Sequence, residues 1–302
     1  MLTIRELVKV YSGQITALRG ISLDIPPGMF GLLGPNGSGK TTLMRIIAGL
    51  LEPTSGQVLL DGVDVVGRPE LVWPRLGNLP QYFGFYPSLT GAAMLLHMLR
   101  LKGVDSPLGL DRLCAELLER VNLTTAANRK VKHYSGGMRQ RLGIAQAIAG
   151  DPDLLVVDEP TAGLDPEERI RFYRLLAELA ESRTVILSTH IVEDVAVLCP
   201  RFAVIRQGTV LTQTTPSEAR GRIAGTMFEG EVSREELVLL AESARVTQAH
   251  LVEGRNRVRI HDPDGQCPPG FSPTSATLED AYLILTEAGA NPSGAPAGAA
   301  PA

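Results

Sequence analysis

The stretch Gly34-Pro35-Asn36-Gly37-Ser38-Gly39-Lys40-Thr41-Thr42 lies between a short apolar run at 29–33 and a helical pattern at 43–50. Glycines in such a loop let successive backbone N–H groups point into one concavity, and the N-terminus of the following helix favours an anion there. Lys40 adds a positive charge beside the terminal phosphates of a nucleotide, and the Thr41 hydroxyl can hold Mg²⁺. A plain glycine-rich turn before a core helix needs neither side chain. The stretch therefore predicts a nucleotide site.

Two acidic residues follow a second apolar run. Leu154-Leu155-Val156-Val157 leads directly into Asp158-Glu159-Pro160. An unbroken run of this kind is typical of a strand buried on both faces of a parallel sheet, and ligands bind at the carboxyl ends of such strands. Taken alone, the two acids fit a solvated loop equally well. Beside a phosphate loop they favour a site in which Asp158 holds the metal and Glu159 orients the attacking water.

A further buried strand is predicted at 184–189, and His190 lies at its end. A lone histidine is more often structural than catalytic. Its place at the carboxyl end of a strand next to the acid-bearing one favours a contact with the γ-phosphate. Between these two strands, Asp165-Pro166 predicts an N-cap and a proline at the first position of a helix that runs to about residue 183.

Composition and charge narrow the classes of protein. A length of 302 residues suggests one large domain and a smaller one, and 44% apolar with 21% charged residues is ordinary for a globular chain. A net charge of −4 gives no reason to expect a nucleic-acid partner. Cys114, Cys199 and Cys267 are isolated and odd in number, so we expect a reducing compartment and neither a disulfide framework nor a zinc site.

No membrane span or signal peptide is expected. Residues 76–99 carry no charge, but they contain prolines, glycines, Asn78, Gln81 and His97, which a helix in hydrocarbon does not favour. The start of the chain, 1–6, lacks a basic segment followed by an apolar core.

An aromatic cluster, Tyr82-Phe83-Gly84-Phe85-Tyr86, precedes three predicted helices at 89–102, 110–121 and 136–149. Such a cluster beside a loop rich in proline and glycine is either a small core or a docking surface for an apolar partner. Ser135 is the expected N-cap of the third helix, and Gly150 lies at the position where helices favour glycine.

With Ser135-Gly136-Gly137 added to the phosphate loop, the acid pair and the histidine, residues 1 to about 215 closely resemble the ATP-binding subunit of ABC transporters. The family's signature corresponds to residues 134–138, where Tyr134 replaces the usual leucine and Met138 the usual glutamine. The resemblance implies an α/β P-loop NTPase core with a mixed sheet, a helical subdomain at about 82–150, and ATP with Mg²⁺ as cofactors.

The resemblance also implies roles for single residues. Tyr11 corresponds to the aromatic that stacks on adenine, and Gln81 to the glutamine that senses Mg²⁺ and the attacking water. Asp165 corresponds to the acid that communicates between paired subunits, and His190 to the switch histidine. Two such subunits, identical or closely related, pair head to tail, so that Ser135-Gly136-Gly137 of one binds the γ-phosphate held by the phosphate loop of the other.

The implied function is to bind and hydrolyse ATP on the cytoplasmic face of the inner membrane and so to power a separate membrane-spanning subunit. Motion would reach that subunit through residues 82–86. An importer subunit shares all of this chemistry and is an alternative. A soluble ATPase of this type, acting on ribosomes or DNA, is a further one, although such chains usually carry two motif sets or a long coiled coil, and here there is one set, no heptad stretch and no basic patch.

Past residue 215 the pattern changes. Strands are expected near 226–232, 245–252 and 256–261, and Ser233 with Glu236 and Thr277 with Asp280 form capping-box patterns, so 216–288 predicts a small α+β appendage. The segment Thr277-Leu278-Glu279-Asp280-Ala281-Tyr282-Leu283 resembles the end of bacterial exporter-type subunits for drugs, lipids or polysaccharides. Residues 289–302 cannot form a core, and we expect a disordered tail.

Overall fold

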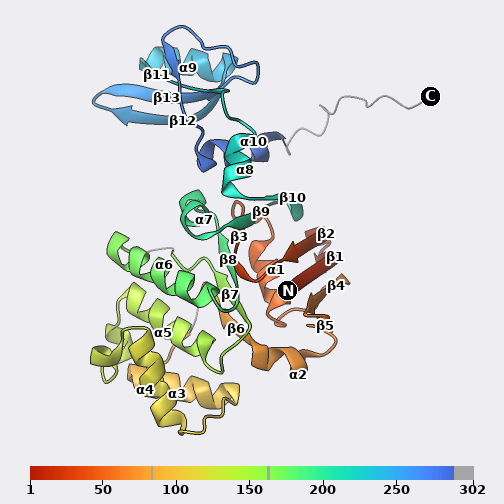
Figure 1. Cartoon of the computed structure of the whole chain (residues 1–302), viewed down its shortest axis with the longest axis vertical. Coiled ribbons are helices and arrows are strands. Elements are labelled where there is room, and N and C mark those ends of the chain that lie inside the picture. The colour runs from red at the N-terminus through yellow and green to blue at the C-terminus, as the bar shows by residue number, and fades with distance from the viewer. Residues whose placement is uncertain (83, 162–163, 289–302) are drawn as a thin grey trace, which may run out of the picture.

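A computed structural model describes residues 1–82, 84–161 and 164–288 (Figure 1). Phe83 of the aromatic cluster and the expected tail at 289–302 lie outside the described residues. Within them, the chain forms three sheets with helices packed around the central one, and the C-terminal sheet lies at one end of the long axis (Figure 1).

The central sheet has the strand order β10-β9-β3-β8-β7-β6. Its strands are β3 (Gly28–Leu33), β6 (Leu76–Leu79), β7 (Leu154–Asp158), β8 (Thr184–Thr189), β9 (Arg201–Arg206) and β10 (Thr209–Thr214). All neighbours are parallel except the β9–β10 hairpin. Because β3, β8 and β7 are adjacent and parallel, the segments that follow them meet at one edge. β10 forms one edge of the sheet and β6 the other.

A second, antiparallel sheet has the order β2-β1-β4-β5. It contains β1 (Leu2–Tyr11), β2 (Ile15–Ile25), β4 (Ser55–Leu60) and β5 (Val63–Asp64). Helix α1 (Lys40–Ile47) lies between the two sheets, since Leu43 and Ile46 share one apolar core with Ile4 of β1 and Val156 of β7. The helix ends earlier than the predicted residue 50 because Gly49 adopts a φ of +68°.

The other face of the central sheet is covered by a helical layer. It comprises α3 (Gly91–Lys102), α4 (Leu110–Arg120), α5 (Gly136–Ile148), α6 (Pro166–Ala180) and α7 (Val192–Leu198). The short helices η2 (Thr124–Ala126) and η3 (Val131–His133) lie between α4 and α5, whereas α2 (Pro69–Val72) and η1 (Trp73–Arg75) lie between β5 and β6. Leu95, Leu118 and Ile144 of the layer pack in one core with Leu155 and Leu187 of the sheet. Helix α6 ends three residues before the predicted position.

The C-terminal sheet has the order β12-β13-β11-β14. Its strands are β11 (Met227–Val232), β12 (Arg245–Val252), β13 (Arg255–His261) and β14 (Phe271–Pro273), and its helices are α8 (Pro216–Gly221), α9 (Arg234–Ser243) and α10 (Leu278–Ala288). Both expected capping boxes form. The sequence did not predict β14 or α8.

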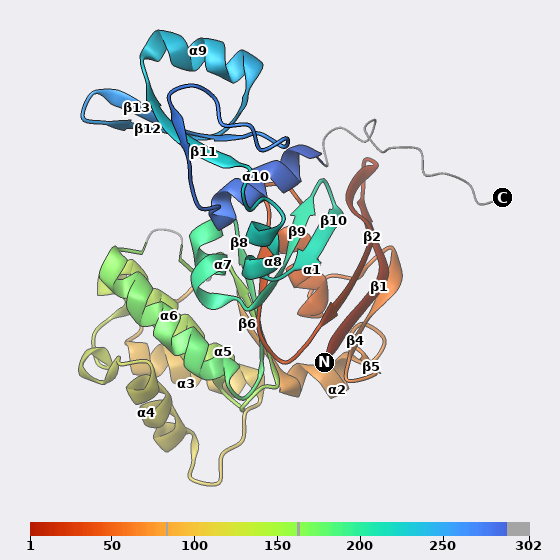
Figure 2. The same cartoon turned by 45° about the horizontal axis from the view of Figure 1, so that its top comes forward.

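Helix α10 connects the C-terminal sheet to the central one (Figure 2). Leu278 and Ala281 of this helix belong to the same apolar core as Val195 of α7 and Phe202 of β9. On the other side, the buried Asp280 accepts from Arg259 of β13 at 2.8 Å. The last helix is therefore shared between the two parts of the chain.

Candidate active site

The phosphate loop is closely packed on its outer side. A Cβ on Gly34 would lie 2.2 Å from the carbonyl oxygen of Ile205, and Gly39 has a φ of +107° with its Cβ position 2.7 Å from the carbonyl oxygen of Ala17. Only glycine fits at both places without moving backbone. The loop is further fixed by the Gly208 N–H, which donates to the carbonyl of Ser38 at 2.9 Å.

Lys40 is buried at the start of α1. Its Nζ donates to the carbonyl oxygens of Gly34 at 2.7 Å and Pro35 at 3.1 Å, and lies 3.6 Å from Oε1 of Glu159. Burial lowers the pKa of Lys40, and the Glu159 carboxylate opposes this effect. The ammonium group thus holds the start of the loop against the start of α1. When a nucleotide binds, its phosphate oxygens can replace the two carbonyl oxygens as acceptors for this group.

Two of the predicted catalytic residues, Gln81 and His190, contact the carboxylate of the third, Glu159. Its Oε2 accepts from Nε2 of Gln81 at 3.2 Å and lies 3.1 Å from Nδ1 of His190. The residue has a φ of +46°, and its N–H donates to the carbonyl of Ser188 at 2.9 Å. Because His190 is 41% exposed and Glu159 only 9%, the histidine closes the solvent side of a sheltered carboxylate.

Asp158, the last residue of β7, is a suitable ligand for a cation. Burial raises the pKa of this carboxyl, and the Ser188 and Thr41 hydroxyls oppose the rise. Its Oδ1 is buried and has no hydrogen-bond partner among the described residues, which is costly for a carboxylate. Carboxylate, hydroxyl and amide oxygens are the donors that Mg²⁺ takes, so Asp158, Thr41 and Gln81 fit this ion.

Lys40, Thr41, Gln81 and Glu159 line one surface pocket of about 360 Å³, whereas Asp158 and His190 are not among its lining residues. It is lined by Ala17, Asn36, Gly37, Gly39, Lys40, Thr41, Thr42, Gln81 and Glu159. Tyr11 lies beside it, with its hydroxyl 3.3 Å from Oγ1 of Thr42 and its ring 5.4 Å from the Nζ of Lys9. Ala17 was not predicted, because no motif marks a small residue on β2.

The remaining predicted site residues begin two other helices. Oγ of Ser135 caps α5 by accepting from the Met138 N–H at 3.2 Å, and Oδ1 of Asp165 caps α6 by accepting from the Glu168 N–H at 2.8 Å. Ser135, Gly136 and Asp165 are exposed, and no described residue from 135–137 lines the phosphate pocket. The chain therefore carries a second helix N-terminus, open to solvent, apart from its own phosphate loop.

Tyr134, one of the two departures from the usual signature, is accommodated by a glycine. Its buried hydroxyl donates to the carbonyl of Ala126 at 2.8 Å, and a Cβ on Gly91 would lie 1.8 Å from the hydroxyl oxygen. The tyrosine and the glycine at the start of α3 are thus fitted to each other, and together they anchor the segment that leads into Ser135.

Gly91→Ala is expected to lower the free energy of unfolding by about 2 kcal/mol, because the new methyl group displaces the tyrosine hydroxyl. Adding Tyr134→Leu should restore most of the loss, since leucine has no hydroxyl at the point of contact. Gly221→Ala is the matched control, as nothing lies within 4 Å of its Cβ position. Urea denaturation of the four proteins measures these differences, and equal stability of Gly91→Ala and Gly221→Ala contradicts the fit.

A phosphate loop, a buried strand that ends in two acids, and a histidine on the neighbouring strand define a P-loop ATPase cassette. Residues 18–162 match the family model described as ABC transporter. The Nod factor export ATP-binding protein I of Paraburkholderia xenovorans is 33% identical over 303 residues, which cover 93% of this chain and 95% of that protein. The chain belongs to the family of ABC transporter ATP-binding proteins, whose members hydrolyse ATP.

Further relatives agree with this assignment. The daunorubicin/doxorubicin resistance ATP-binding protein DrrA of Streptomyces peucetius is 39% identical over 224 residues, 74% of this chain and 67% of that protein. The solved dimeric structure of the cassette MJ0796, in a post-hydrolysis state bound to ADP and Pi, has a TM-score of 0.64 at 28% identity and covers 71% of this chain and 98% of that one. These findings confirm the expected exporter-type ATP-binding subunit and its P-loop fold.

Across the described parts of the chain, no helix combines the length and apolar character that crossing a membrane requires.

Proposed function

We propose that this chain hydrolyses ATP on the cytoplasmic face of the inner membrane, as one half of a head-to-tail dimer, and so drives export through a separate membrane-spanning subunit. The observation that carries the proposal is the convergence of Lys40, Gln81 and His190 on the Glu159 carboxylate beside the phosphate pocket. A carboxylate held in this way is placed to accept a proton from water while the lysine faces the phosphates.

Each predicted side chain then has a task. Glu159 orients and deprotonates the attacking water, Gln81 helps to place that water, and His190 contacts the γ-phosphate. Tyr11 stacks on adenine at the edge of the pocket. Thr41, Asp158 and Gln81 would hold Mg²⁺, which neutralises phosphate charge when bound.

The dimer follows from the solvent-exposed N-terminus of α5. Ser135, Gly136 and Gly137 present backbone N–H groups at a helix start that has no phosphate loop of its own chain beside it, so the γ-phosphate of a second copy is the anion that fits. Asp165 caps α6 through the N–H of Glu168, and the side chain of Glu168 packs against Gly137, with its Oε2 2.5 Å from the Cβ position of that glycine. We assign Asp165 the role of relaying the state of one site to the other.

The concentration dependence of ATP hydrolysis by the purified chain tests this dimer. Because each complete site needs two copies, the rate per subunit should rise with protein concentration and level off once dimers predominate. A rate per subunit that stays constant from nanomolar to micromolar protein, with no dimer present, contradicts the proposal.

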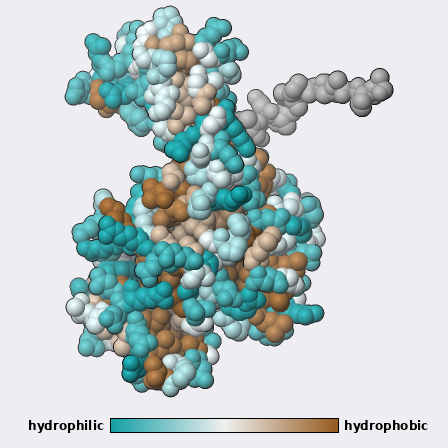
Figure 3. Space-filling model, viewed as in Figure 1, coloured by the Kyte–Doolittle hydropathy of each residue, from teal (hydrophilic) through white to brown (hydrophobic). Residues whose placement is uncertain are grey.

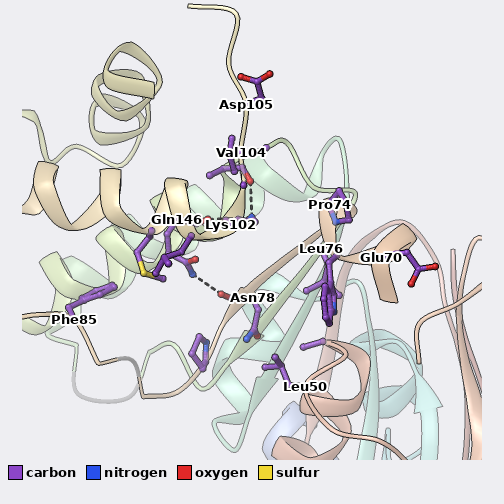
Figure 4. Close-up of a pocket in the computed structure, with 18 residues that line it drawn as sticks. Leu50, Glu70, Pro74, Leu76, Asn78, Phe85, Lys102, Val104, Asp105 and Gln146 are labelled. Carbon is purple, nitrogen blue, oxygen red and sulfur yellow. Dashed lines mark hydrogen bonds between the residues drawn. The ribbon is translucent and has the colours of Figure 1, made fainter. Parts of the chain in front are cut away.

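This chain has a pocket, between its helical layer and its central sheet, that is suitable for docking the membrane subunit. A pocket of about 900 Å³ lies there, and Phe85 of the aromatic cluster forms one side of it, across from Leu50 and Leu76 (Figure 4). Tyr82 and Tyr86 are 84% and 56% exposed, so these two members of the cluster do not form a core. Brown side chains gather in the lower half of the molecule, where α2, α3 and α4 lie (Figure 3).

The rim of this pocket also suits a segment from a membrane protein. Leu101, Leu50 and Trp73 line the pocket and are more than half exposed. Glu70 and Asp105 also line it, well apart from each other (Figure 4), and neither forms an ion pair with any described residue. Cytoplasmic loops of membrane proteins carry an excess of lysine and arginine. An amphipathic cytoplasmic segment of the partner therefore complements both the apolar side chains and the two acidic side chains of the pocket.

Leu101→Asp is expected to abolish the stimulation of ATP hydrolysis by the membrane subunit and to leave hydrolysis by the isolated chain unchanged. The reason is that the new charge must be desolvated when the partner covers this 70% exposed side chain. Leu239→Asp on α9 is the matched control, because its leucine is 66% exposed and lies far along the chain from the pocket. Normal stimulation and co-purification of the Leu101→Asp protein would show that docking occurs elsewhere.

A further inference from the structure

Asp194, in the first turn of α7, is fully buried and accepts four hydrogen bonds. Its Oδ2 accepts from Oγ1 of Thr161 at 2.6 Å and from Oγ1 of Thr189 at 2.9 Å. Its Oδ1 accepts from the guanidinium of Arg169 and from the Tyr173 hydroxyl. A buried carboxylate with every lone pair engaged is stable in one position only, so it acts as a rigid connection between the groups that bond to it.

These four donors come from segments that bear on the nucleotide site. Thr161 lies two residues after Glu159, and Thr189 directly precedes His190. Arg169 and Tyr173 lie on α6, the helix that begins after Asp165. Asp194 is not among the residues that line the phosphate pocket. It therefore reaches both loops of the site and the dimer-facing helix without contacting the site itself.

We propose that Asp194 is a positioning residue for ATP hydrolysis. Through Thr161 and Thr189 it joins the two loops that carry Glu159 and His190, so that the carboxylate and the imidazole keep their 3.1 Å separation. Through Arg169 and Tyr173 it also fixes the start of α6 relative to the same loops. The inference rests on the proposed function, because it takes Glu159 and His190 as groups that act in hydrolysis.

The polar character of this cluster argues for such a role over simple packing. Leucine-rich contacts would fill the same space more cheaply than a carboxylate, which must be desolvated on folding. Hydrogen bonds have strict directions, whereas apolar contacts allow neighbouring side chains to slide. A directional connection is useful where a catalytic group has to be held to within a fraction of an ångström.

The test uses the two threonines, because replacing Asp194 itself leaves Arg169 without its buried acid and can prevent folding. Thr161→Val and Thr189→Val keep the shape of the side chain and remove only the hydroxyl. Each is expected to lower kcat for ATP hydrolysis by about tenfold to about a hundredfold, with KM for ATP within about twofold of wild type, since misplacement of a catalytic group affects the chemical step.

Two sets of controls separate positioning from stability. Thr161→Ser and Thr189→Ser retain the hydroxyl and should restore kcat to within about threefold of wild type, because the bond to Asp194 is kept. Thr214→Val removes an equally buried hydroxyl that donates to a carboxylate, Glu218 at 2.9 Å, away from the site. It should lower the melting temperature as much as Thr161→Val does while kcat stays unchanged.

The outcomes distinguish this inference from the proposed function. If wild type hydrolyses ATP, Glu159→Gln does not, and both valine variants keep wild-type kcat, the inference is wrong while the proposed function stands. If the valine variants lose kcat only as much as Thr214→Val does, the role of Asp194 is structural and the inference is again wrong. If purified wild type shows no ATP hydrolysis at any protein concentration, the proposed function fails, and the inference with it.

Discussion

Glu159→Gln is expected to bind ATP as tightly as wild type and to lower kcat by about a thousandfold, the scale of a lost general base. Glutamine has almost the same shape and can still contact Gln81 and His190, so the pocket keeps its form. It cannot accept a proton from the attacking water. Its neutral amide also leaves Lys40 without a counter-charge 3.6 Å away, which leaves that ammonium free for phosphate.

Phosphate release at saturating ATP and Mg²⁺ measures the loss of turnover, and size-exclusion chromatography measures assembly. Because binding without hydrolysis removes the step that separates the subunits, the variant should accumulate as a dimer with ATP. Glu167→Gln is the matched control, an acid of the same type that is 77% exposed on α6 and should keep wild-type kcat. A Glu159→Gln protein that stays monomeric under these conditions contradicts the head-to-tail arrangement.

The parts of the fold that the sequence predicts well are those with a single strong pattern. β7 is apolar up to its last residue, Asp158, and β8 has Val185-Ile186-Leu187 at its centre, and the structure buries every residue of both strands. β10 was not predicted because Thr209–Thr214 mixes polar and apolar residues on a half-buried edge strand. β14, with three residues, is too short to show a period.

Helix α8 is preceded by a capping-box pattern, although the sequence analysis does not predict the helix. Thr215 and Glu218 form a capping box, and Pro216 occupies the first helical position between them. The same pattern at Ser233 and at Thr277 does predict the helices that begin there. The difference is the length of the apolar stretch that follows, since α8 contains only six residues and no periodic face.

For the site, sequence order predicts which residues carry the chemistry but not what holds them. That Glu159 and His190 are neighbours follows from their place at the ends of two adjacent parallel strands. The role of Asp194 does not follow, because its four donors are spread over residues 161–189 and meet only in the folded chain. Gly91 and Tyr134 are likewise fitted to each other across 43 positions of sequence, a separation at which no local pattern connects them.

Lys40→Ala is expected to weaken ATP binding by about a hundredfold, the equivalent of one or two buried charge-assisted hydrogen bonds. The substitution removes the ammonium group that faces the phosphates. It also frees the carbonyls of Gly34 and Pro35, which Nζ holds at 2.7 and 3.1 Å, so the loop loses its closed shape before the nucleotide arrives.

The variant should remain folded, and the sign of the pKa shift gives the reason. Burial lowers the pKa of Lys40, so its charged form is less favourable in the folded protein than in the unfolded chain. Removing that charge therefore does not reduce the free energy of unfolding through this group at neutral pH. A melting temperature close to that of wild type, together with weak binding, is the expected combination.

Lys102→Ala is the matched control for this measurement. Lys102 is half-buried and, like Lys40, donates to main-chain carbonyls, at 2.7 Å to Ala149 and 3.2 Å to Ala147, and burial lowers its pKa to about 8. It lies outside the phosphate pocket, so its loss should leave the Kd for ATP unchanged. Calorimetric titration of both variants with ATP and Mg²⁺ decides the matter, because a Lys40→Ala protein with the affinity of Lys102→Ala cannot have its nucleotide in the loop formed by residues 34–42.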